Sequence, residues 1–278
     1  MNLRLRTHAL PRAAMAVALL GVLADAPSKS VRADVLSASS SGYGLGVDIS
    51  ALVINLDVGP LPAGVSGSAP APYNQAGTVL NVLTTDVVPL VISGTVSADA
   101  VNATATSNVD GSAGSKTTFA SGGVVGAGVD VVTLPILPPG VTLLGLDGTL
   151  SSTAQITGDF GSLVATGTTV IQDLDLVISG IVVDLSAYVN VAVAPNTSIN
   201  LAALGILNSS LILNEQVVAV DQTSISVNAF HLSLGLLNIT ADVILGHSQA
   251  QVTAIPEPGS ILLAGLGGLA CVALRRRF

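Results

Sequence analysis

The sequence predicts an all-β protein, with an antiparallel β-sandwich-like body between two short terminal signals. Hydrophobic residues make up 50% of the chain but aromatic residues only 3%, so the apolar content is aliphatic, with many of the β-branched residues that strands favour. Apolar and polar residues alternate in several segments, as in half-buried strands. Gly, Pro and Asn separate these segments, and no stretch of ten or more residues between 34 and 254 shows a helical period.

Residues 1–33 are typical of a secretory signal peptide. Three arginines lie within the first twelve residues, and the apolar run that follows, 13–24, is too short to span a membrane comfortably. An earlier small-residue cleavage site is followed by a proline, which would obstruct a peptidase. We therefore expect a signal helix that signal peptidase removes between Ala33 and Asp34.

Residues 34–254 are predicted to form an extracytoplasmic domain of strands throughout. The alternation is clear at 182–193 (VVDLSAYVNVAV), which predicts one half-buried strand. The segment 224–237 also alternates, but its apolar parity switches, and a β-bulge near Ala229 or Phe230 would explain the switch. Further alternating strands are expected at 150–156, 163–171 and 239–245.

Turn signals separate these strands, among them Asp110-Gly111, Asp147-Gly148 and Pro195-Asn196. Their spacing favours a sandwich or a related antiparallel arrangement. A β-solenoid is the alternative, because Gly, Asn, Thr and aliphatic residues suit it as well. A solenoid should show a fixed short period, however, and the sequence contains none.

Residues 255–278 contain three features in a fixed order. A Pro-Glu-Pro triplet comes first, and its two prolines keep it extended. An apolar run at about 259–274 predicts a transmembrane helix, and a basic tail at 275–278 would hold the end of that helix on the cytoplasmic side. The residues concerned are Pro256, Glu257 and Pro258 in the triplet, and Arg275, Arg276 and Arg277 in the tail.

This order, at the extreme C-terminus, closely resembles the PEP-CTERM sorting signal of Gram-negative bacteria. The resemblance implies that an exosortase, a membrane protease, recognises Pro256, Glu257 and Pro258. The enzyme would cut near the triplet and release or re-attach the body. The resemblance therefore implies an exported precursor that is tethered to the inner membrane and then reaches the cell surface or the extracellular space.

Four stretches of the body resemble the bacterial choice-of-anchor P family. The stretches are SGYGLGVDISAL (41–52), VGPLPAG (58–64), NAFHLSLGLL (228–237) and ADVILGHSQAQV (241–252). The resemblance implies an exported, surface-attached domain. It carries over no catalytic residues.

The charge distribution excludes one class of partner. Between residues 33 and 274, Lys116 is the single base against sixteen acids, which gives a net charge of −15. Binding to nucleic acid needs clustered Lys and Arg, so nucleic acid is not a partner. The only cysteine is Cys271 in the C-terminal apolar run, so the body has no disulfide and no cysteine nucleophile.

Few residues of the body point to chemistry. A serine hydrolase would need a motif such as G-x-S-x-G, and none occurs. His247 is expected to bond to the backbone at a strand end, and His231 to be a satisfied, half-buried side chain. The two histidines lack an obvious third metal ligand, so no metal site is predicted. Asp173 and Asp175 share one strand face, but whether a third acid faces them is left open.

These observations predict a non-enzymatic β domain with a structural or adhesive role and no cofactor. Two alternatives remain open. One is a surface enzyme that acts on polysaccharide, which a cleft with two facing carboxylates would support. The other is a module that binds carbohydrate or calcium. The calcium-binding loop D-x-D-x-D-G does not occur. If calcium nevertheless binds the folded domain, it would raise the melting temperature. Extracellular polysaccharide is thus a candidate partner beside signal peptidase and exosortase.

Overall fold

The computed structural model describes residues 35–51, 54–88, 92–112, 114–133, 141–159, 161–236 and 239–254. The predicted terminal helices, the cleavage pair Ala33–Asp34, the triplet 256–258 and the arginines 275–277 lie outside these residues. Within the described residues, no helix is long and apolar enough to cross a membrane. The strands are β1 (Val35–Ala51), β2 (Ile54–Leu61), β3 (Ser66–Ser68), β4 (Tyr73–Val88), β5 (Ile92–Ser107), β6 (Lys116–Thr133), β7 (Val141–Gly158), β8 (Val164–Ile178), β9 (Ile181–Val183), β10 (Thr197–Ile199), β11 (Ser210–Val218), β12 (Ser224–Leu236) and β13 (Ile239–Ala254).

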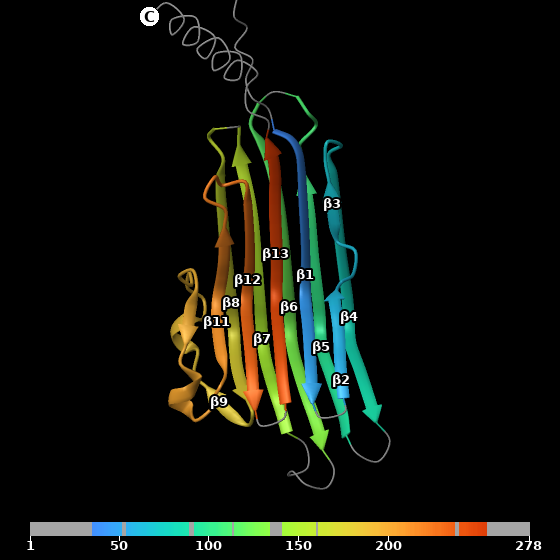
Figure 1. Ribbon diagram of the computed structural model, residues 1–278, viewed down its shortest axis with the longest axis vertical. Coiled ribbons are helices and arrows are strands. Elements are labelled where there is room, and N and C mark those ends of the chain that lie inside the picture. The colour runs from blue at the N-terminus through green and yellow to red at the C-terminus, as the bar shows by residue number, and fades with distance from the viewer. Residues whose placement is uncertain are drawn as a thin grey trace, which may run out of the picture. The chain divides into compact units, whose positions relative to one another are not determined.

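The strands form two face-to-face antiparallel sheets (Figure 1). Sheet A has the order β10-β11-β12-β13-β1-β2, with β3 also paired to β1, and sheet B has the order β4-β5-β6-β7-β8-β9. The predicted antiparallel sandwich is therefore confirmed, and the solenoid alternative is wrong because the strands run up and down instead of coiling. The alternating segments predicted at 150–156, 163–171 and 239–245 lie in β7, β8 and β13.

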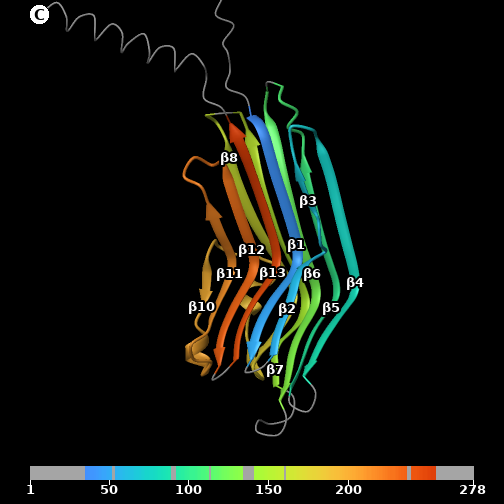
Figure 2. The ribbon, with the colours of Figure 1, turned by 45° about the vertical axis from the view of Figure 1, so that its right-hand side comes forward.

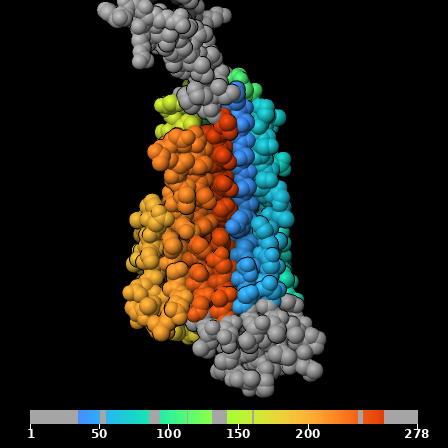
Figure 3. All heavy atoms as spheres, in the orientation of Figure 1, coloured from blue at the N-terminus to red at the C-terminus, as the bar shows by residue number. Residues whose placement is uncertain are grey.

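The first and last strands pair with each other in the interior of sheet A. Val35 lies opposite Ala254 at one end of this pairing, and Ala51 lies opposite Ile239 at the other. Figures 1 and 3 show the two strands, blue and red, running side by side down the face of the domain. All other main pairings join strands that follow one another in sequence. The β1–β13 pairing thus closes an otherwise sequential fold.

Two main hydrophobic cores and a third cluster of three buried residues, Val65, Ala103 and Ala105, lie between the sheets. The larger consists of Leu, Val and Ile side chains, with the fully buried Phe230 among them. The smaller contains Val35, Ile156 and Val252, and it lies in the half of the domain where β1 begins and β13 ends. Small residues predominate between the two cores.

The small residues between the cores include glycines at which the main chains of the two sheets touch. A Cβ on Gly44 of β1 would lie 2.1 Å from the carbonyl oxygen of Gly123. A Cβ on Gly122 of β6 would lie 2.2 Å from the carbonyl oxygens of both Tyr43 and His247. Only glycine leaves room for this approach. We call Gly42, Gly44, Gly122 and Gly123 the glycine waist.

In both sheets, a row of residues with unusual backbone conformation interrupts the strands. The strands bend together near the middle of their length (Figure 2). The non-glycine members of this row have positive φ angles: 52° at Asn81 in β4, 48° at Asp173 in β8 and 51° at Asn214 in β11. In β12 the parity switch is real, because Ala229 and Phe230 are both fully buried. The predicted bulge is wrong, however, because the register with β13 is the same on both sides of the switch.

Two predicted local features are also wrong. Asp147-Gly148 is not a turn: it lies inside β7, where the register with β8 shifts and Gly148 has a φ of 134°. The predicted strand 182–193 exists only as far as Val183. Asp184 Oδ1 accepts a hydrogen bond from the Ser186 amide (2.9 Å), and a short 3₁₀ helix, Ser186–Tyr188, follows. Such side-chain-to-backbone bonds compete with strand pairing.

Lys116, the single base of the body, is buried at the start of β6. Its Nζ donates hydrogen bonds to Asp110 Oδ1 (2.5 Å) and Ser112 Oγ (2.9 Å). The hydrogen bond from Lys116 holds the pKa of Asp110 well below its usual range, and bonds from Ser112 act in the same direction. The predicted turn at Asp110-Gly111 is therefore also an ion-pair site.

Candidate functional site

Three aspartates form a row across the outer face of sheet A. Asp48 of β1 lies directly opposite Asp57 of β2 on one side and Asp242 of β13 on the other. All three are exposed. Like charges directly opposite one another on neighbouring strands destabilise a sheet. A nearby positive charge would reduce the repulsion between these three carboxylates.

His231 of β12 supplies that charge when its ring is protonated. Its Nδ1 lies 2.8 Å from Glu215 Oε2, and its Nε2 lies 2.8 Å from Asp242 Oδ1. Because each ring nitrogen faces a carboxylate oxygen, both nitrogens act as donors in the imidazolium form. Burial lowers the pKa of His231, but the hydrogen bonds to Asp242 and Glu215 outweigh it, and the pKa is raised above its ordinary value. His231 therefore links the acidic row to β11.

The network continues from Glu215 to a second histidine. Asn228 Nδ2 donates to Glu215 Oε2 (2.7 Å), which leaves Asn228 Oδ1 to accept from His247 Nδ1 (2.6 Å). The Tyr43 ring stacks on His247 with the ring centroids 4.5 Å apart. Burial lowers the pKa of His247 to about 4, so this ring is neutral at pH 7. We call Tyr43, Glu215, Asn228, His231, Asp242 and His247 the histidine network.

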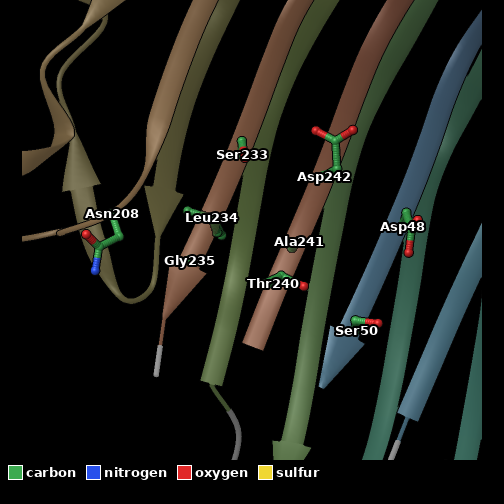
Figure 4. Close-up of a pocket in the computed structure, with 9 residues that line it drawn as sticks. All are labelled: Asp48, Ser50, Asn208, Ser233, Leu234, Gly235, Thr240, Ala241 and Asp242. Carbon is green, nitrogen blue, oxygen red and sulfur yellow. The ribbon is translucent and has the colours of Figure 1, made fainter. Parts of the chain in front are cut away.

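Two shallow hollows flank the acidic row, and both include Asp48 and Asp242. The first has a volume of about 380 Å³, and hydroxyl groups of Ser50, Ser233 and Thr240 also line it (Figure 4). The second has a volume of about 180 Å³ and reaches Asp57 and Tyr43. Both hollows offer carboxylate and hydroxyl oxygens on an open sheet face.

The histidines were expected to be structural, and the structure places both in this network. His231 is half-buried and satisfied, as predicted, although its partners are two carboxylates. His247 bonds to a side chain, Asn228, and not to the backbone as predicted. Asp173 and Asp175 lie apart from the network, on the outer face of sheet B, where Asp175 is directly opposite Asp147. Nothing in the sequence paired Asp48 with Asp242, because that pairing depends on the closure of β1 against β13.

The carboxylate and hydroxyl oxygens of the acidic row and its hollows can accept hydrogen bonds from a ligand. Both nitrogens of His231 are engaged, so in this arrangement neither is free to accept a proton as a general base must. In the described part of the chain, no group of three or more His, Cys, Asp or Glu side chains is placed to hold a metal ion. A domain without a cofactor stays the prediction, and calcium binding stays the alternative to it.

Comparison with known proteins identifies the C-terminus. The family model of the PEP-CTERM protein-sorting motif matches residues 254–277, which include the predicted triplet and the terminal arginines. The predicted sorting signal is therefore confirmed, and it indicates an exported, membrane-passing precursor that an exosortase processes. No curated protein and no solved structure matches the chain. The resemblance of the body to the choice-of-anchor P family stays a prediction.

Proposed function

We propose that this chain is an exosortase substrate displayed at the cell surface or in the extracellular matrix, where it has a structural or adhesive role and no catalytic one. One observation carries the proposal: the sorting motif begins at residue 254, which is also the last residue of β13. At the other end, β1 begins one residue after the predicted signal-peptide cleavage between Ala33 and Asp34. The folded domain thus fills the segment between the two signals.

The test is the mass and terminal sequence of the protein recovered from the cell fractions of its producing organism. We expect a surface or extracellular product that begins near Asp34 and ends near Pro256–Pro258. Replacing Pro256, Glu257 and Pro258 together with alanine should leave the intact tail, through Phe278, in the membrane fraction.

The matched control replaces the neighbouring Gly259 and Ser260 with alanine and keeps the triplet. This variant should be processed like the wild type. If the wild-type protein keeps its tail in the inner membrane, the proposal fails, and the chain would be a membrane-tethered periplasmic domain.

The acidic row favours a more specific role, the binding of extracellular polysaccharide. Carboxylates are strong acceptors for sugar hydroxyls, and here they lie beside hydroxyl-lined hollows. Their place on an open sheet face supports binding and not hydrolysis. We expect the paired change Asp48→Asn and Asp242→Asn to reduce co-sedimentation with the producer's polysaccharide at least about tenfold, about 1.4 kcal/mol. Asp175→Asn, on sheet B, is the control. Equal co-sedimentation by both variants and the wild type would exclude this role.

A further inference from the structure

β4 is the open edge of the sandwich. An edge strand exposes unpaired backbone groups, and natural proteins protect such edges with short strands, Lys, Pro or covering segments. The edge strands β9 and β10 have three residues each, and β2 has eight with a proline among them. β4 has 16 residues, neither Lys nor Pro, and a single acid, Asp86. Figure 2 shows β4 at the rim of sheet B.

The opposite side of the sandwich is closed by hydrogen bonds onto the free edge of β8. The Ala165 amide donates to Gln222 Oε1 (3.1 Å), and the Gly167 carbonyl accepts from Gln216 Nε2 (3.1 Å). The Ile171 carbonyl accepts from the Asn190 amide (2.8 Å). Among the described residues, no strand pairs with the outer edge of β4 and no comparable capping bond reaches its main chain.

Two leucines lie exposed in the middle of this edge. Leu80 is 65% exposed and Leu83 is 72% exposed. Three positions separate them, yet both lie on the outer face, because Asn81, with its φ of 52°, interrupts the alternation. Val79 and Val82 lie on the inner face against the larger core. The outward positions are therefore 78, 80, 81 and 83.

We propose that β4 pairs antiparallel with β4 of a second copy of this chain, so that two copies of sheet B become one continuous sheet. The interrupted alternation fixes the register. Outward residues meet outward residues along the whole strand only when Leu80 of each copy lies opposite Asn81 of the other. Val79 then lies opposite Val82 of the other copy, and Thr78 lies opposite Leu83.

The charge distribution leaves the β4 edge, in this register, free of the repulsion that acts elsewhere between two copies. Residues 34–254 hold fifteen acids and one base, a net charge of −14, so two copies repel each other wherever their acids meet. From Tyr73 to Thr85 the strand carries no charged residue. In the proposed register Asp86 lies opposite Gln75 of the other copy, so no carboxylate lies opposite a carboxylate. Leu83 becomes the diagonal neighbour of Leu80 in the other copy, a distance at which long apolar side chains interact.

Cysteine cross-linking tests the register. In the full chain with Cys271→Ser, we expect a mixture of Thr78→Cys and Leu83→Cys proteins to form the mixed disulfide dimer under mild oxidation. That dimer should exceed either homodimer at least about fivefold, because directly opposite residues have the Cα separation that a disulfide needs. A mixture of Val217→Cys and Val220→Cys, exposed positions away from β4, is the control. A statistical mixture of dimers with Thr78→Cys and Leu83→Cys would overturn the register.

Light scattering tests the association itself. We expect the full chain, solubilised in detergent and corrected for it, to have twice the monomer mass, and Leu83→Lys to have the monomer mass at the same concentration. Val220→Lys, which changes a fully exposed turn residue, should stay dimeric. A wild-type protein that is monomeric at all concentrations would overturn the proposal. Because neither measurement reads processing of the tail, a failure here leaves the sorting proposal untouched.

Discussion

Replacing Gly122 with alanine is expected to unfold the domain or to cost more than about 4 kcal/mol of its free energy of unfolding. The added Cβ would lie 2.2 Å from two carbonyl oxygens, those of Tyr43 and His247. Overpacking usually costs about 1–3 kcal/mol, because side chains can change rotamer to relieve it. Here the colliding atoms belong to the main chains of β1 and β13, interior strands of sheet A that cannot move separately.

Urea denaturation followed by far-UV circular dichroism measures this loss. Gly59→Ala is the matched control, because Gly59 also lies in a strand but a Cβ there would have no atom within 4 Å. We expect the control to stay within about 0.5 kcal/mol of the wild type. A Gly122→Ala protein with a wild-type transition midpoint would show that the two sheets are farther apart at the glycine waist.

Stability is expected to reach a maximum near pH 6.5, because the two histidines of the network titrate in opposite senses. The pKa of His247 falls from 6.5 in the unfolded chain to about 4 in the folded one. The unfolded chain therefore binds more protons between these values, and stability falls as the pH drops through this window, by about 3 kcal/mol in total. The pKa of His231 is raised on folding, so its contribution is present below pH 6.5 and is lost as the pH rises through the folded-state value.

Denaturation at pH values from 4 to 9 measures both sides of this maximum. His247→Phe keeps a ring against Tyr43 and removes the titration, so the loss between pH 6.5 and 4 should shrink. His231→Gln should leave that acid side unchanged and flatten the alkaline side. A stability that changes in one direction only across this range, or an acid side that persists in His247→Phe, would contradict the assignment.

The fold class and four of the strands were predictable because they depend on local patterns. Alternation located β7, β8, β12 and β13, and the C-terminal sorting motif begins where the last strand ends. The errors arose from two local effects, a side chain that binds the nearby backbone and a glycine whose positive φ lies inside a strand. Asp184 ends β9 in this way, although the apolar alternation continues beyond it. Gly148 looked like a turn residue, but its positive φ serves the register shift within β7.

The candidate site was beyond prediction for a different reason. Alternation places Asp48 and Asp242 on outer faces, but it does not state which strands become neighbours. The acidic row exists because β1 pairs with β13, and the histidine network exists because β11, β12 and β13 lie side by side. Strand order is a property of the closed sheet, and no short window of sequence contains it.

The position of β13 also determines when sheet A can be completed during export. A chain that crosses a membrane from its N-terminus delivers β13 last, although β13 belongs in the interior of sheet A. Sheet B joins only consecutive strands, so it can assemble while the chain is still emerging. Sheet A keeps β12 and β1 as two open edges until residue 254 has emerged. The final folding step therefore waits for the residues that directly precede the sorting signal.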